Sequence, residues 1–278
     1  MRLGQSRRSG NIVDLRGRRG GAGVGLGLGT VVLLLVGALL GVDPNDLAQV
    51  AEGPAPPTEP APTGTPQDEG GDFVAALLGS MEDTWRTTAP QANIRYEDPQ
   101  LVLYDGIVQS ACGTNTAATG PFYCPTDARI YLDLSFFREL ERFGASGDFA
   151  VAYVIAHEFG HHIQNLEGTL GEVNRVQQQT DQRTANDLSV RTELQADCYA
   201  GVWGYSAAQR NLLEPGDVEE GLQAAASVGD DHLQQMAGQA VTPEAFTHGS
   251  SAQRERAFRT GFERGDPAAC DTFRDLRR

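Results

Sequence analysis

The chain has 278 residues, of which 40% are hydrophobic, so one buried core with attached segments is expected. The formal net charge is −15, yet residues 1–19 hold six Arg against one acid, a balance of +5 that leaves −20 for the remainder. An acidic body of this size repels phosphate backbones, so nucleic acid is not expected as a partner.

Residues 20–42 form an uncharged stretch of 23 residues, long enough to cross a hydrocarbon core of about 30 Å as a helix. The positive-inside rule then predicts a single-pass protein of the cell membrane, with residues 1–19 as a cytoplasmic head and the rest outside. A cleaved signal peptide is the alternative, although the stretch is long and no clear small-x-small site follows it directly. Residues 43–72 hold seven prolines and too little apolar surface to fold, which predicts a disordered linker before a domain over 73–278.

The pattern within residues 73–278 predicts an α+β domain whose C-terminal half is mainly helical. The β-like runs precede the longest apolar helix, so a small sheet is expected before it. The expected elements are a helix over 72–88, β-like runs over 100–109 and 128–134, and helices over 135–143, 149–167, about 186–210, 215–237 and 250–264.

The four cysteines, Cys112, Cys124, Cys198 and Cys270, show neither a CxxC nor a zinc-finger spacing, so a cysteine-based metal site is not expected. An even number of cysteines beyond a membrane segment favours disulfides, if that side is oxidising. The short separation of Cys112 and Cys124 favours their pairing, which leaves Cys198 for Cys270. Four buried free thiols are the alternative.

Residues 157–161 read His-Glu-Phe-Gly-His, which supplies three of the parts that zinc-dependent hydrolysis needs. His157 and His161 lie about 40° apart around a helix, so both imidazoles can reach one metal ion. Glu158 is rotated by about 100° and is expected beside a water molecule as its base. The alternative is a helix with a solvated Glu and two hydrogen-bonded His. Against it, an apolar run precedes the motif, and three of five histidines fall within six residues.

A third ligand is expected on the later helix that carries Glu193 and Asp197. These acids are four residues apart and share a face, so Glu193 can reach the zinc ion while Asp197 accepts the outer N–H of His157. A surface acid is the alternative for Glu193.

His248 and Arg254 lie six residues apart around the start of the last predicted helix. Either side chain is a candidate to donate a hydrogen bond to the oxyanion of a tetrahedral intermediate. The alternative is that a serine caps this helix and that Arg254 pairs with an acid such as Asp197 or Glu158.

Segments spread over nearly the whole chain carry a family resemblance: residues 7–14, 124–125, 130–133, 157–164, 193–198, 229–231 and 248–254. Together they resemble the bacterial "putative neutral zinc metallopeptidase" family, single-pass membrane proteins with a short Arg-rich head. The order HExxH, then ExxxD, then His with Arg six later is also similar to the gluzincin peptidases. Here one membrane span replaces several, and Gly follows His248 where those relatives commonly have Pro.

The resemblance implies a zincin-like domain with Glu193 as the third ligand and Asp197 behind a ligand histidine. It also implies that residues 128–133 form an edge strand that binds the substrate backbone in extended form. The expected function is therefore zinc-dependent hydrolysis of peptide bonds, with one Zn²⁺ ion and a peptide or protein substrate. A non-catalytic, zinc-stabilised extracytoplasmic binding domain and a zinc amidase acting on envelope glycopeptides are the alternatives.

Overall fold

The computed structural model describes residues 1–17, 63–117 and 120–274. The predicted transmembrane helix over 20–42 and most of the predicted linker over 43–72 lie outside these residues. Within the described ranges, no helix combines the length and the apolar character that a membrane crossing requires.

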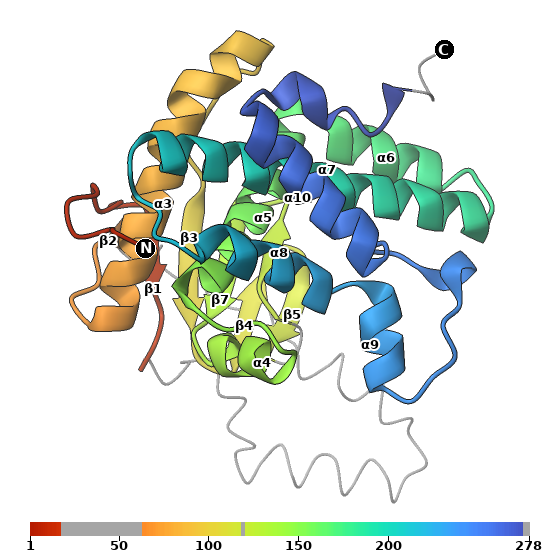
Figure 1. Cartoon of the computed structure of the whole chain (residues 1–278), viewed down its shortest axis with the longest axis horizontal. Coiled ribbons are helices and arrows are strands. Elements are labelled where there is room, and N and C mark those ends of the chain that lie inside the picture. Colours follow the sequence, from red (N-terminus) through yellow and green to blue (C-terminus); the bar gives the residue numbers. More distant parts are fainter. Residues whose placement is uncertain (18–62, 118–119, 275–278) are drawn as a thin grey trace, which may run out of the picture.

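The described residues form a mixed α+β fold in which one sheet precedes a helical C-terminal half, as expected (Figure 1). The sheet has the strand order β2-β1-β3-β7-β6, in which β1, β3 and β7 run parallel and β2 and β6 run antiparallel to their neighbours. Its strands are β1 (Ile12–Asp14), β2 (Thr63–Gly64), β3 (Gln100–Tyr104), β6 (Phe122–Cys124) and β7 (Arg129–Asp133), and a separate hairpin is formed by β4 (Ile107–Ser110) and β5 (Gly113–Thr116).

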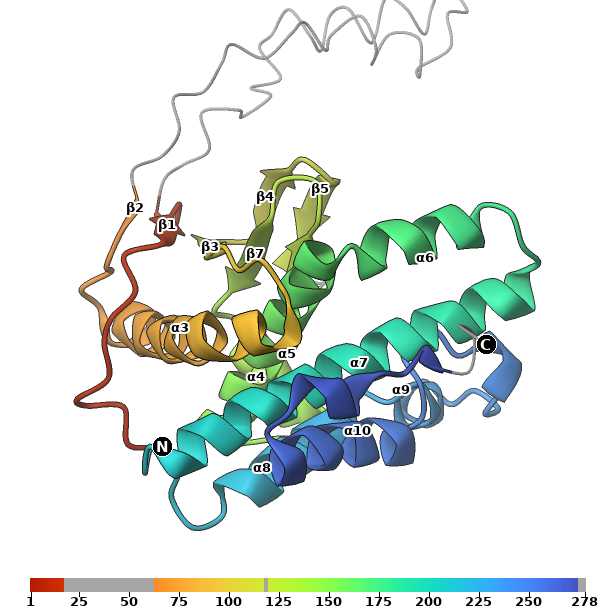
Figure 2. The same cartoon turned by 90° about the horizontal axis from the view of Figure 1, so that it is seen from above.

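Helix α5 lies between the strands and the C-terminal helices (Figure 2). The α-helices are α3 (Glu69–Thr88), α4 (Phe136–Arg142), α5 (Asp148–Glu167), α6 (Thr169–Gln177), α7 (Gln182–Gln209), α8 (Asp217–Ser227), α9 (Asp230–Met236) and α10 (Ser251–Arg264). The short 3₁₀ turns within the described ranges are η1 (Ala89–Ala92), η3 (Pro243–Ala245) and η4 (Pro267–Cys270).

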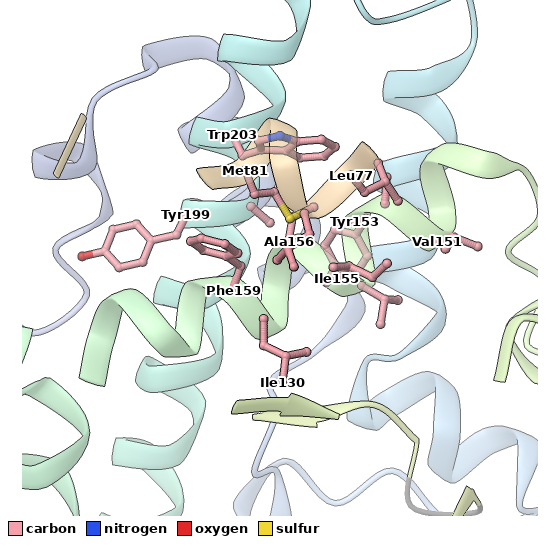
Figure 3. Close-up of a cluster of buried hydrophobic side chains, with 14 of the residues drawn as sticks. Leu77, Met81, Ile130, Val151, Tyr153, Ile155, Ala156, Phe159, Tyr199 and Trp203 are labelled. Carbon is pink, nitrogen blue, oxygen red and sulfur yellow. The ribbon is translucent and has the colours of Figure 1, made fainter. Parts of the chain in front are cut away.

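The hydrophobic core surrounds α5 on several sides (Figure 3). Phe159 of α5 belongs to the same buried cluster as Met81 of α3, Ile130 of β7 and Trp203 of α7, and these side chains are at most 1% exposed. Burying a side chain of this size contributes about 1.5–3 kcal/mol, so the whole of α5 is held firmly. A rigid helix of this kind is the support that a preorganised site needs.

The structure differs from the predicted elements where glycines interrupt the chain. The run over 100–109 is divided at Gly106, whose φ of +74° turns the chain into the β4–β5 hairpin. The helix over 215–237 breaks into α8 and α9 at Gly229, whose backbone is extended, with φ −71° and ψ 142°. Only glycine fits there, because a Cβ atom would lie 2.4 Å from the backbone nitrogen of Ser251. Helix α6 was not expected from the sequence, although Leu170, Val173 and Val176 recur at helical spacing within its nine residues.

The folded unit includes residues that were expected to lie outside it. Strand β1 pairs with β2 and β3, so residues 1–17 belong to the fold rather than to a separate head over 1–19. Strand β2 and the N-cap of α3 at Asp68 fall within the predicted linker, ahead of the expected domain start at 73. Elements of two or three residues carry no readable periodicity, and only the sheet reveals them.

The prediction that residues 128–133 form the sheet edge was wrong. Strand β7 pairs with β3 on one side and with the short β6 on the other, in the register Phe122↔Tyr131, Tyr123↔Ile130 and Cys124↔Arg129. Among the described strands, β6 is therefore the edge on this side of the sheet.

Both predicted disulfides are present. Cys112–Cys124 joins the turn of the β4–β5 hairpin to β6, and Cys198–Cys270 joins α7 to η4. The alternative of free thiols is thereby excluded for all four cysteines.

Candidate metal centre

Two histidines of α5 and a glutamate of α7 converge on one point. Nε2 of His157 lies 3.1 Å from Oε2 of Glu193, and Nε2 of His161 lies 3.4 Å from Oε1 of the same carboxylate. Two ligand atoms on one tetrahedral zinc ion, each about 2.0–2.1 Å from the metal, lie about 3.3 Å apart. The donor set and its spacing therefore fit a zinc ion.

A glycine inside the motif allows α7 to come this close. A Cβ atom on Gly160 would lie 2.8 Å from the carbonyl oxygen of Ala196, so the two helix backbones touch there. Ala196 lies between Glu193 and Asp197, and this contact sets both acids against the histidines of α5. Asp181 caps the start of α7 by accepting the backbone N–H of Thr184.

The outer nitrogen of each histidine is held by an oxygen atom. Nδ1 of His157 donates to Asp197 Oδ1 at 2.8 Å, as predicted from the spacing of the acids on α7. Nδ1 of His161 donates to Gln164 Oε1 at 2.8 Å. Both Nε2 atoms are consequently left without a proton in the neutral imidazole and face the metal position.

Gln164 is a site residue that sequence reasoning missed. Its amide nitrogen donates to the carbonyl oxygen of Thr192 at 2.7 Å and to Gln195 Oε1 at 2.9 Å, which turns its oxygen toward His161. The available signal was its position three residues after His161, on the same helical face, as a polar residue. The structure shows that Gln164 is fully buried, so its side chain needs hydrogen-bond partners.

Asp197 is the centre of a buried charged cluster behind His157. Arg254 donates to both of its oxygens, from Nε at 2.8 Å and Nη2 at 2.9 Å, and the hydroxyl of Tyr153 donates at 2.5 Å. Burial alone would raise the pKa of Asp197, but Arg254 and His157 outweigh it and lower this pKa to about 2. Asp197 is therefore ionised, and Arg254 pairs with it as one alternative expected.

The two histidines of the candidate site lie in a strongly negative environment. Burial alone would lower the pKa of His157, but Asp197 and Glu193 outweigh it and raise this pKa to about 10. The pKa of His161 is raised against the same effect of burial, mainly by Glu193. The site favours positive charge, which a divalent cation supplies.

Glu158 is buried beside the ligands and, within the described residues, forms neither a hydrogen bond nor an ion pair. Burial raises its pKa, although the two histidines act in the opposite direction. Its carboxylate is therefore available to a bound molecule rather than committed to the protein.

His248 is positioned by Asp230, a second residue whose role was not assigned from the sequence. One Asp230 oxygen accepts the backbone N–H groups of Thr247, His248 and Gly249 at 2.7–2.9 Å, and the other lies 3.1 Å from Nδ1 of His248. This hydrogen bond raises the pKa of His248 despite partial burial. The negative charge of Glu193 also acts to raise this pKa.

A capping serine of α10 and the third histidine of α5, His162, complete the surroundings of the site. Ser250 caps α10 in a capping box with Gln253, as the alternative expected. His162 lies away from the metal position, between the hydroxyl of Tyr123 at 3.1 Å and the carbonyl oxygen of Glu97 at 2.8 Å.

The fold and the site together define an α+β protein with a candidate His-His-Glu metal centre, formed by the HExxH motif of α5 and Glu193 of α7. The chain belongs to the family described as "Putative neutral zinc metallopeptidase", which matches residues 1–273. It is 44% identical over 283 residues to "Uncharacterized protein YpfJ" of Escherichia coli strain K12, covering 98% of this chain and 99% of that protein. It is 45% identical over 212 residues to "Uncharacterized protein Rv2575" of Mycobacterium tuberculosis, covering 72% of this chain and 69% of that protein. No solved structure shows significant similarity to it.

Proposed function

We propose that this protein is a zinc-dependent peptidase that hydrolyses peptide bonds within peptides or proteins. His157, His161 and Glu193 are the proposed ligands, and Asp197 and Gln164 hold the two histidines in place. The observation that carries the proposal is the uncommitted carboxylate of Glu158, buried next to three converging ligand atoms.

A bound zinc ion supplies Lewis acidity that polarises a carbonyl group and makes water a stronger acid. Glu158 takes the proton from the attacking water and later gives it to the leaving amine. The burial that raises the pKa of Glu158 helps it to hold that proton between the two transfers. His248, held by Asp230, donates a hydrogen bond to the oxyanion, whereas Arg254 keeps Asp197 in place.

The short strand β6 is the proposed docking edge for an extended peptide. Within the described part of the chain, only β7 pairs with it, so its outer edge is open to another strand. The hydroxyl of Tyr123 in β6 contacts His162, which lies one helical turn beyond Glu158 on the same face of α5. An extended backbone on this edge would therefore run along the Glu158 side of α5.

We also propose that residues 20–42 attach the protein to a membrane, and the support for this is their apolar sequence alone. The two disulfides favour an oxidising, extracytoplasmic compartment for the folded domain.

The test compares zinc-loaded wild-type protein with Glu158→Gln and with Glu172→Gln, a control that changes an exposed glutamate of α6. We expect the wild type and the control to cleave members of a broad peptide library, as measured by mass spectrometry. Glu158→Gln should lose at least about 10²-fold in turnover while it binds one zinc ion and melts like the wild type.

Two outcomes would contradict the proposal. Undiminished cleavage by Glu158→Gln would remove this carboxylate from the chemistry. A wild-type protein that binds one zinc ion and cleaves no peptide or protein would instead be a zinc-stabilised binding domain, or an amidase if it releases envelope glycopeptides.

A further inference from the structure

The N-terminal head, defined here as residues 1–17, supplies an interior strand of the sheet. Strand β1 lies between β2 and β3, and its register with β3 pairs Ile12 with Leu101 and Val13 with Val102. Ile12 is 1% exposed and packs into the main hydrophobic core. Without the head, β3 would lose its partner on that side and part of the core would be open to solvent.

A buried carboxylate of α3 depends on the head for its hydrogen bonds. Glu82 is fully buried and accepts from Arg7 Nη2 at 2.5 Å, from Ser9 Oγ at 2.6 Å and from Asn11 Nδ2 at 2.8 Å. All three donors belong to the head. A buried carboxylate that lost them would be strongly unfavourable, so the contact requires the head in place.

The backbone of the head lies directly against α3. A Cβ atom on Gly79 would be 2.2 Å from the carbonyl oxygen of Arg7, and the N–H of Ser9 donates to the carbonyl oxygen of Ala75 at 2.9 Å. Glycine in the middle of a helix normally costs stability relative to alanine, and here it makes room for the head.

The arginines of the head are paired with acids of the folded domain. Arg8 binds Asp72 through two hydrogen bonds of 2.7 and 2.9 Å, and Arg16 binds Asp68 through two of 2.6 and 2.9 Å. Asp68 also caps α3, so this pair ties the head to the start of that helix. The arginines of residues 1–17, which contribute to the prediction of a cytoplasmic head, are thus paired within the fold.

We infer that the head and residues 63–274 lie on the same side of the membrane. Strands that share hydrogen bonds cannot be separated by a hydrocarbon core of about 30 Å, so an odd number of membrane crossings between residues 17 and 63 is excluded. This corrects the predicted single-pass arrangement of a cytoplasmic head and an extracytoplasmic domain, so the membrane attachment proposed for residues 20–42 is not a single crossing. The chain's own head covers the surface that β3 and α3 form.

The first test locates both parts with single reporter cysteines in the full-length protein. Gly4→Cys marks the head and Gly171→Cys marks α6, since both glycines are exposed and have no heavy atom within 4 Å of a new Cβ. The parent protein is the control, because its four cysteines are bonded in pairs. A membrane-impermeant maleimide is applied to right-side-out and to inverted membrane vesicles.

We expect the two reporters to label together, in the same vesicle orientation and to the same extent. The inference is supported if, in a given vesicle orientation, both reporter cysteines are labelled or both are protected. Detergent lysis should expose both cysteines to the maleimide. Labelling of one reporter in right-side-out vesicles and of the other in inverted vesicles overturns it.

The second test asks whether the head is docked in the purified full-length protein. Gly79→Ala should lower the Tm by roughly 2–12 °C and speed proteolysis of the head, because the new methyl group meets the Arg7 backbone. The matched control is Gly171→Ala, where the added methyl group meets nothing and the Tm should hold or rise. A Tm that rises in both variants overturns the inference, because an undocked α3 would gain from alanine.

Discussion

Substitution of Asp197 by Asn tests the buried cluster behind the metal centre. The change keeps the size of the side chain but removes the charge that faces Arg254, whose next acid, Glu193, is 3.9 Å away. Removing one partner of a buried ion pair costs about 3–5 kcal/mol, and 1 kcal/mol corresponds to about 2–4 °C in a domain of this size. We therefore expect the Tm to fall by about 6–20 °C.

The same substitution should also weaken zinc binding by about 10–100-fold, because the amide holds the outer N–H of His157 less firmly than a carboxylate does. Thermal unfolding followed by circular dichroism and zinc competition with a chelating dye measure the two effects. Asp187→Asn is the matched control on the same helix, since its pair with Arg191 at 2.7 Å is exposed and contributes under about 1 kcal/mol.

A double variant separates stability from metal binding. Replacing Arg254 by Met in the Asp197→Asn background removes the unpaired buried charge, so much of the lost Tm should return. Zinc affinity should stay low, since His157 still lacks its carboxylate. The reasoning fails if Asp197→Asn melts and binds zinc like Asp187→Asn, or if the double variant recovers zinc affinity.

Three further changes have defined outcomes. Gln164→Met should lower zinc affinity about tenfold in the dye competition, because the Nδ1 atom of its histidine partner loses its acceptor. Because its pKa is raised, His248 stays protonated at pH values above about 6.5, the ordinary pKa of histidine. Activity that depends on a hydrogen bond from this imidazolium therefore falls as pH rises through the raised pKa. Asp230→Asn should shift this alkaline limb of the pH–rate profile to lower pH. Replacing both Cys198 and Cys270 by Ala should lower the free energy of unfolding in urea by about 4 kcal/mol, because the disulfide spans 72 residues.

The sequence alone was sufficient to predict how the side chains of the candidate metal centre are directed within each of its two helices. His157, Glu158 and His161 take their relative directions from the helical repeat, and Glu193 and Asp197 follow the same rule on α7. These positions are set within one or two turns of a single helix, so their geometry can be read from spacing. The family resemblance over residues 1–273 has the same origin, since it rests on such short segments.

Only the tertiary structure decided which distant residues meet. Gln164 behind His161 depends on the contact of α5 with α7, and Arg254 faces Asp197 rather than the metal position because α10 lies against α7. The strand β6 covers β7, which moves the sheet edge away from residues 128–133.

The head gives the clearest contrast between sequence and fold. From sequence, its arginines and the apolar stretch after it predict a segment on the far side of a membrane. In the fold, β1 is an interior strand and the head supplies the donors for Glu82. Charge and hydropathy are properties of single segments, whereas a strand of three residues is stabilised only by neighbours from residues 63–64 and 100–104. That pairing exists only once the chain has folded.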